Sequence, residues 1–155
     1  MSANSDRRGP NVGRELALSD RNLNTTLIGL SLFIFTFLLI FLYNRASTGT
    51  IDPVLFQVTL GDAVGAAFSF AVSALYNYIL IFWGPAEHIK GLLHRRRAEL
   101  FFTLGLFMML LGLALILFTL GLLPVASAAL LLFLGYVSMY IYASRKTIPE
   151  AQKVA

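Results

Sequence analysis

The sequence predicts an all-α integral membrane protein with four transmembrane helices. Hydrophobic residues make up 57% of its 155 residues. Charged residues make up only 13%, about half the share in an average soluble domain. The charges are separated by apolar runs of roughly 20 residues, the length that spans the hydrocarbon core of a bilayer. Lys and Arg also alternate between the connecting segments, as they do in multi-pass membrane proteins.

The predicted organisation is two antiparallel hairpins in a single transmembrane domain, residues 14–147. Residues 1–13 form a polar tail that we expect to be disordered, and residues 148–155 form a second tail. We expect the spans at residues 23–43, 60–83, 98–120 and 125–143.

Turn residues separate these spans. The Asp-Pro pair at 52–53 marks a turn or a helix start, and the Gly-Pro pair at 84–85 ends the second span. Gly-Leu-Leu-Pro at 121–124 predicts a tight hairpin, because Gly suits the end of one helix and Pro the start of the next. Residues 86–97 combine apolar and basic positions at helical spacing, which predicts a short basic interfacial helix between spans 2 and 3.

The distribution of Lys and Arg predicts the topology. The segment before the first span has four, the first loop one, the second loop four, the third none and the segment after the fourth span three, which accounts for all 12. This alternation predicts a multi-pass protein with both termini in the cytoplasm, and we expect a prokaryotic plasma membrane. The net charge of +4 is explained by topology, so no nucleic-acid partner is expected. The absence of cysteine excludes disulfides and thiolate chemistry.

The second span is predicted to be the packing centre. Lipid does not require its rows of small residues at four-residue spacing, whereas small residues allow other helices to approach closely. A projection of the row from Gly61 to Asn77 shows that it wraps around the helix, which favours a packing seam over a straight pore lining. The predicted helix-packing residues are Gly61, Gly65, Ser69, Ser73, Ala63, Ala67 and Ala71 on the second span, and Gly105 and Gly112 on the third.

Four residues of the second span form a candidate polar or substrate site. Asp62 is expected in the first turn of its helix, either hydrated there or binding an ion or proton at the mouth of a path. Asn77 lies deeper, between Tyr76 and Tyr78. The alternative for these three is an interhelical hydrogen bond from the Asn and interfacial anchoring by the tyrosines.

The second loop carries a basic cluster that could contact anionic or phosphate-bearing lipid. Stop-transfer charge explains the same residues equally well. His88 and His94 are six residues apart and point in different directions on a helix, so we expect no metal site. The candidate lipid contacts are Lys90, His94, Arg95, Arg96 and Arg97.

Two short motifs resemble the GtrA-like family. They are the Tyr-Asn-Tyr triplet at 76–78, followed by Trp83, and the Leu-Asn-Thr triplet at 23–25. Ile81 and Phe82 stand where that family often has Asn and Arg. The resemblance implies a four-span protein that helps to translocate polyprenyl-phosphate-linked sugars.

The sequence shows no phosphate-binding loop, nucleophile elbow or paired carboxylates, so neither enzymatic activity nor a cofactor is expected. We predict a non-catalytic accessory or scaffold subunit. Its expected partners are the lipid bilayer and either copies of itself or other membrane subunits, which it would contact through the small-residue faces of the second span. The alternatives are a small oligomeric transporter or channel and a GtrA-like flippase.

Overall fold

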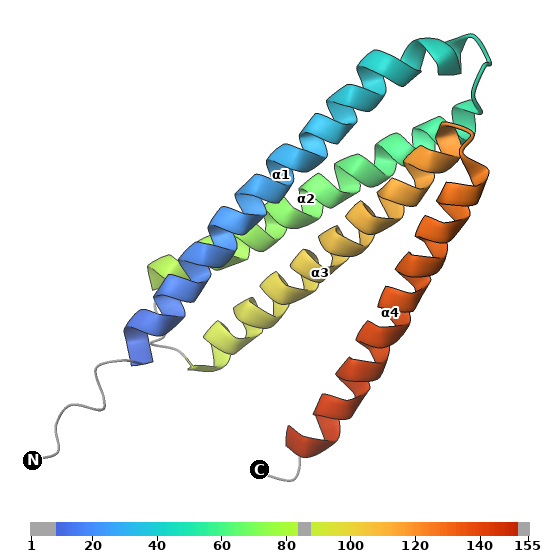
Figure 1. The fold of residues 1–155 in the computed structure, drawn as a ribbon. Coiled ribbons are helices and arrows are strands. Elements are labelled where there is room, and N and C mark those ends of the chain that lie inside the picture. The colour runs from blue at the N-terminus through green and yellow to red at the C-terminus, as the bar shows by residue number, and fades with distance from the viewer. Residues whose placement is uncertain (1–8, 84–87, 152–155) are drawn as a thin grey trace, which may run out of the picture.

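The computed structural model describes residues 9–83 and 88–151, with side chains for residues 15, 17–82 and 93–142. Each helix in this part of the chain contains a segment long and apolar enough to cross a membrane. This confirms the prediction of an all-helical protein with four candidate spans. The helices are α1 (Gly9–Ser47), α2 (Pro53–Trp83), α3 (His88–Thr119) and α4 (Leu123–Ala151) (Figure 1).

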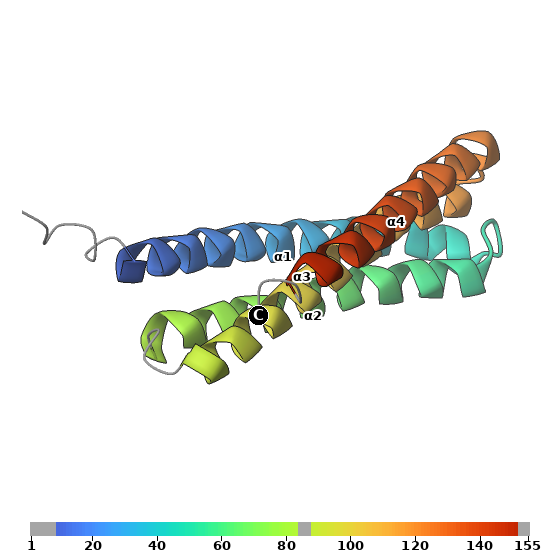
Figure 2. The ribbon, with the colours of Figure 1, turned by 90° about the horizontal axis from the view of Figure 1, so that it is seen from below.

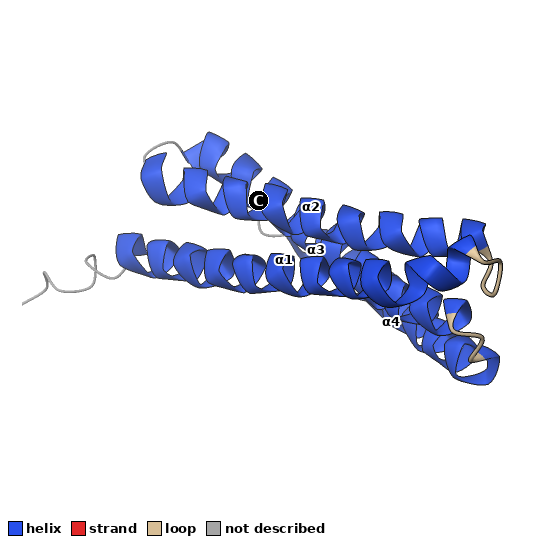
Figure 3. Ribbon diagram, turned by 90° about the horizontal axis from the view of Figure 1, so that it is seen from above, coloured by secondary structure: helices blue, strands red, loops and turns tan. Residues whose placement is uncertain are grey.

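Consecutive helices run in opposite directions, so the bundle has two different ends. The loops at residues 48–52 and 120–122 lie together at one end, called here the short-loop end (Figure 3). The start of α1 at Gly9 and the end of α4 at Ala151 lie at the other end (Figure 1). Arg21 and the three consecutive arginines at 95–97 also belong to this second end, called here the charged end.

The short loops close through glycines in the left-handed region. Gly121 has a φ of 76° and Gly49 a φ of 71°, a conformation that other residues adopt only with strain. After α3, the Leu122 N–H donates to the carbonyl of Leu117 at 3.0 Å, the long bond of a Schellman motif. The predicted tight hairpin at 121–124 is therefore confirmed.

Asp52 caps the start of α2. Its Oδ1 accepts hydrogen bonds from the backbone N–H groups of Val54 and Leu55, at 2.8 and 3.2 Å, and Pro53 occupies the first helical position. The helix consequently starts seven residues before the predicted span. Asp62 lies in the third turn of α2, so its expected place in the first turn was wrong.

Other helix ends also extend past the predicted spans. α3 is one continuous helix from His88 to Thr119, so the separate interfacial helix predicted at 86–97 is not found in the residues described. α1 begins at Gly9 and α4 continues to Ala151, inside segments predicted to be tails. Hydropathy marks only the part of a helix at the level of the lipid chains, and nothing in these sequences stops the helix there.

Helices α1, α2 and α3, called here the three-helix core, pack with α2 in the centre. The α2–α3 contact is the most extensive and the α1–α2 contact is close behind it, so the protein is not divided into two separate hairpins. Seven of the buried positions of α2 alternate at spacings of three and four, the repeat of left-handed helix packing. They are Phe56, Thr59, Ala63, Ala66, Phe70, Ser73 and Asn77.

The same repeat appears on both neighbours of α2. On α1, Asn24, Ser31 and Leu38 are buried at seven-residue spacing. On α3 the buried positions at this spacing all carry small residues, which allow α2 to come close. These are Ala98, Gly105, Gly112 and Thr119.

These buried positions, called here the packing seam, coincide only in part with the predicted rows of small residues at four-residue spacing. Gly61 and Ala71, at the edges of those rows, are exposed, and no atom lies within 4 Å of the place where a Gly61 Cβ would be. The reason is geometric: positions four apart drift by about 40° per step around a helix. Such rows stay on the buried face only over part of their length.

Helix α4 runs obliquely to the core and packs on α3 (Figure 2). Ala126, at its start, is fully buried. Further along, the ring of Phe107 on α3 meets the ring of Tyr140 edge to face, with centroids 5.4 Å apart. The opposite face of α4 is open, with Leu132 77% and Met139 73% exposed.

Candidate functional site

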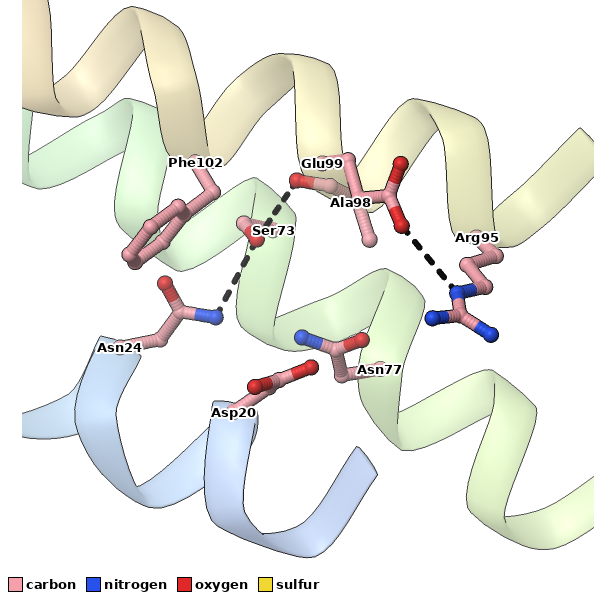
Figure 4. Close-up of a pocket in the computed structure, with 8 residues that line it drawn as sticks. All are labelled: Asp20, Asn24, Ser73, Asn77, Arg95, Ala98, Glu99 and Phe102. Carbon is pink, nitrogen blue, oxygen red and sulfur yellow. Dashed lines mark hydrogen bonds and ion pairs between the residues drawn. The ribbon is translucent and has the colours of Figure 1, made fainter. Parts of the chain in front are cut away.

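A polar pocket of about 200 Å³ lies at the charged end of the three-helix core (Figure 4). Each helix contributes a pair of polar or charged residues four apart in sequence, a spacing that places both on one helix face. The lining residues are Asp20 and Asn24 from α1, Ser73 and Asn77 from α2, and Arg95, Ala98, Glu99 and Phe102 from α3.

A chain of two hydrogen bonds joins the three helices beside this pocket. The Ser73 hydroxyl donates to the carbonyl of Ala98 at 2.8 Å. Because its single proton is used there, Ser73 Oγ accepts the bond from Asn24 Nδ2 at 3.1 Å. This fixes the orientation of the Asn24 amide. Its Oδ1 is left without a hydrogen-bond partner in the described structure, although Asn24 has 0% exposure.

Asn77 provides a second amide without a protein partner. It is 6% exposed, and its side chain forms no hydrogen bond with any residue whose side chain is described. Figure 4 shows its amide facing the carboxylate of Asp20 across the pocket. Asp20 is exposed at the pocket rim.

An ion pair forms the third side of the pocket. Arg95 Nε lies 3.1 Å from Glu99 Oε1, and the two side chains are 65% and 64% exposed. Exposed pairs of this kind contribute roughly 0–1 kcal/mol to stability. Phe102 supplies an aromatic wall, held edge to face against the buried Phe70 with ring centroids 5.9 Å apart.

The predicted Tyr-Asn-Tyr triplet is split by the fold. Only Asn77 lines the pocket. Tyr76 lies beside the ring of His94 on α3, with centroids 5.8 Å apart. Tyr78 is exposed and contacts Phe82 at 4.6 Å between centroids. Three consecutive helical residues point in different directions, so the tyrosines do not join Asn77 in one site.

Asp62 is also separate from the pocket. Its carboxylate lies on α3 at Gly112, where an added Cβ would come within 2.5 Å of Oδ2. Among the described side chains it has no hydrogen bond or ion pair. The glycine therefore provides the space that this carboxylate occupies between α2 and α3.

The predicted basic cluster is divided in the same way. Arg95 is paired with Glu99, whereas Arg96 and Arg97 are exposed. His94 is half-buried, and its Nδ1 has no hydrogen-bond partner among the described residues. The side chain of Lys90 lies outside the described residues, and contact of the cluster with anionic lipid stays a prediction. The described residues contain no group of three or more His, Cys, Asp or Glu placed to hold a metal ion.

The predicted packing residues of α2 and α3 mostly contact each other within the core. An added Cβ on Gly105 would lie 2.7 Å from the ring of Phe70, and one on Gly65 would lie 3.0 Å from Met108. Ser69 donates to its own helix, at the Gly65 carbonyl 2.9 Å away. Large side chains of the core thus fill the space in front of this part of the small-residue row. Ala63 and Ala67 are buried in the same core.

Sequence reasoning singled out three of the eight lining residues as site, packing or lipid-contact residues. Asn77 was predicted as a site residue, Ser73 as a packing residue and Arg95 as a lipid contact, but Asp20 and Glu99 were not singled out. The available signal was the pairing of polar residues four apart near the ends of the spans.

Searches of protein-family models, curated proteins and solved structures give no match to this chain. The GtrA-like resemblance therefore rests on the short motifs alone.

Proposed function

We propose that this protein is a non-catalytic accessory or scaffold subunit of a membrane assembly, and that the outer face of α4 is its partner-binding surface. This outer face consists of Ala128, Leu132, Gly135, Met139 and Tyr142, all of them exposed. Its two small residues are seven apart and alternate with large ones. That exposed pattern is the observation that carries the proposal.

The same pattern inside the molecule supports this assignment. On α3, Gly105 and Gly112 are seven apart, and both are covered by side chains of α2. On α4, Ala128 and Gly135 have the same separation but nothing covers them, and no atom lies within 4 Å of a Cβ added at Gly135. Lipid needs no small residues on a helix face, whereas helix–helix contact in a membrane depends on them.

The partner surface is thus on a different helix from the one expected. Most of the small-residue faces of α2 are used within the three-helix core, through contacts such as Gly65 with Met108. In the same core, Gly105 of α3 packs against Phe70 of α2. α2 stabilises the subunit itself. The single-sided packing of α4 leaves the surface on which another copy or another subunit would bind.

The distribution of charge supports an orientation with the charged end in the cytoplasm. Arg21 and the arginines at 95–97 belong to that end, whereas Arg45 is the one cation near the short-loop end in the described residues. The positive-inside rule places the arginine-rich end on the cytoplasmic side. α1 begins and α4 ends at that end (Figure 1).

Replacing Gly135 by Leu tests the proposal. The protein is purified in mild detergent from cells that express it at its native level, and its mass and co-purifying subunits are measured. We expect the unaltered protein to be isolated with a second copy or another subunit, and G135L to lose that association. G29L is the matched control, because Gly29 is also exposed with no atom near its Cβ position. Isolation of the unaltered protein as a monomer, without another subunit, would contradict the proposal.

The polar pocket favours a second candidate, a small transporter. The pocket gives a solute a binding place at one end of the bundle. Its lining has two carboxylates and one guanidinium, which suits a cation better than the phosphate of a GtrA-like lipid carrier. Flux of a cationic solute across liposomes that contain the purified protein, abolished in N77L, would support transport over a purely structural role.

A further inference from the structure

We propose that the pocket at the charged end binds a primary ammonium group, either that of a small free amine or that of a phosphatidylethanolamine headgroup. This binding site does not depend on the partner surface assigned to α4. It is argued from the unpaired acceptors, the charge and the position of the pocket.

The first observation is that the pocket residues have acceptors without donors. The bond from Asn24 to Ser73 directs the amide nitrogen away, so the carbonyl oxygen turns toward Phe102 (Figure 4). That oxygen is buried and has no partner in the described structure. A buried acceptor without a donor destabilises a protein, and a ligand that donates hydrogen bonds removes this penalty.

The second observation concerns Asn77 and Asp20, which face each other across the pocket (Figure 4). Asn77 is more than nine-tenths buried and has no hydrogen bond with the described side chains. Figure 4 shows its amide and the Asp20 carboxylate directed toward the same space. With Asn24, these residues offer a carboxylate, one amide oxygen of fixed orientation, and the amide of Asn77, which no hydrogen bond to a described side chain holds and which can turn its oxygen toward a donor. A primary ammonium carries three N–H donors and no acceptor, which matches that set.

The charge of the lining favours a cation. The guanidinium of Arg95 is already paired with Glu99 at 3.1 Å, so the negative charge of Asp20 is left without a counter-ion in the described pocket. Phe102 presents an aromatic ring to the same space, and an organic cation gains from contact with such a ring. Because no metal-binding group of acidic or His side chains is found among the described residues, an organic ammonium fits better than a divalent metal.

The size and position of the pocket identify the two sources. A volume of about 200 Å³ holds roughly six waters at about 30 Å³ each, so it admits a small amine with part of its hydration shell. The pocket lies near the ends of the apolar segments, which begin at Ala17 and Leu93 and end at Phe82. It is therefore at headgroup level. A phosphatidylethanolamine headgroup would place its ammonium in the pocket and its phosphate near the exposed Arg95.

The test uses the full-length protein in phosphatidylcholine nanodiscs. Ethanolamine hydrochloride, choline chloride and potassium chloride are added separately, and binding is measured by calorimetry and by the shift in Tm. In a second arm, the protein is extracted from vesicles with equal phosphatidylethanolamine and phosphatidylcholine, and the retained lipid is measured by native mass spectrometry. Choline has the same charge but no N–H donor.

Substitutions connect the binding to the pocket. We expect D20N and N77L to lower the affinity for ethanolamine, or the preference for phosphatidylethanolamine, at least tenfold. E15Q is the matched control, because Glu15 is an exposed carboxylate on α1 outside the pocket lining. N77L removes no described hydrogen bond, so it keeps the fold and decides the question if D20N does not fold.

A positive result with ethanolamine alone identifies a free amine as the ligand, and a positive result with lipid alone identifies the headgroup. Either supports the proposal. It is overturned if neither arm shows binding, if choline or potassium binds as well as ethanolamine, or if N77L binds as the unaltered protein does.

Discussion

The three-helix core and α4 differ in how much of each helix is buried against other helices. In the most apolar 18-residue stretch of each helix, 33% of the residues of α2 are buried, compared with 17% in α1, 11% in α3 and 6% in α4. The core is tied together by a buried hydrogen-bond chain and by rings that meet glycines. α4 is attached to α3 through one face. The comparison indicates that α2 is enclosed between its neighbours, whereas α4 is covered on one face only.

The largest expected effect comes from filling the glycine seam of the core. In G105A, the new methyl group would lie 2.7 Å from the Phe70 ring, and overpacking of this kind costs about 1–3 kcal/mol. Unfolding in a mild-to-denaturing detergent titration measures the loss. The control is G135A on α4, where no atom lies within 4 Å and no loss of stability is expected. Equal stability of the two variants would show that α2 and α3 are not closely packed at Gly105.

A smaller effect is expected from the hydrogen-bond chain. S73A removes the hydroxyl that joins Asn24 and Ala98. Interhelical bonds in membranes contribute on average about 0.6 kcal/mol and at most about 1.7 kcal/mol, so we expect a loss in that range. The hydroxyl of Ser138 on α4 bonds only the Leu134 carbonyl of its own helix. S138A should therefore leave the unfolding curve unchanged, and an equal loss in both variants would contradict the assigned role of Ser73.

The third prediction concerns the mobility of α4 relative to α3, and no change in stability is expected. The chain has no cysteine, so spin labels can be attached at chosen positions. Labels at L100C and M139C report on α3 and α4, and labels at T25C and L75C report on α1 and α2; all four positions are exposed. Double electron–electron resonance should give a broad α3–α4 distance distribution and a narrow α1–α2 one in the protein without partners. A narrow α3–α4 distribution would show that α4 is held firmly by α3 alone.

The sequence predicted the four spans because hydropathy depends on composition, which needs no knowledge of neighbours. It also marked Asp52 and Pro53 as a turn or a helix start and placed a tight turn at 121–124, since capping and turn chemistry are local, but it began the second span only at residue 60. It did not predict the helix lengths. Hydropathy falls where a helix leaves the lipid chains, but the backbone hydrogen bonds of α3 continue through the polar residues before Leu93.

The site was predicted only in part because it depends on three helices at once. Asn77 stood out as a polar residue in an apolar span. Asp20 could be recognised as a pocket residue only once α1 placed it opposite Asn77, which is 57 residues away in the sequence. The packing face of α2 was predicted only in part for a related reason. Rows at four-residue spacing can be read from one helix alone. Which positions of α2 are buried, at spacings of three and four, depends on the helices on either side.

The two short loops also bear on how this protein enters the bilayer. Arg45 and Asp52 are the charged residues in or beside the first loop, and the second loop, closed by Gly121, has none. Moving an arginine or aspartate through the membrane centre costs about 2.5–3.5 kcal/mol on insertion scales. In the proposed orientation, with the charged end in the cytoplasm, the α3–α4 hairpin can be inserted as a pair without transferring any loop charge, whereas insertion of α1 and α2 carries one cation and one anion across the membrane.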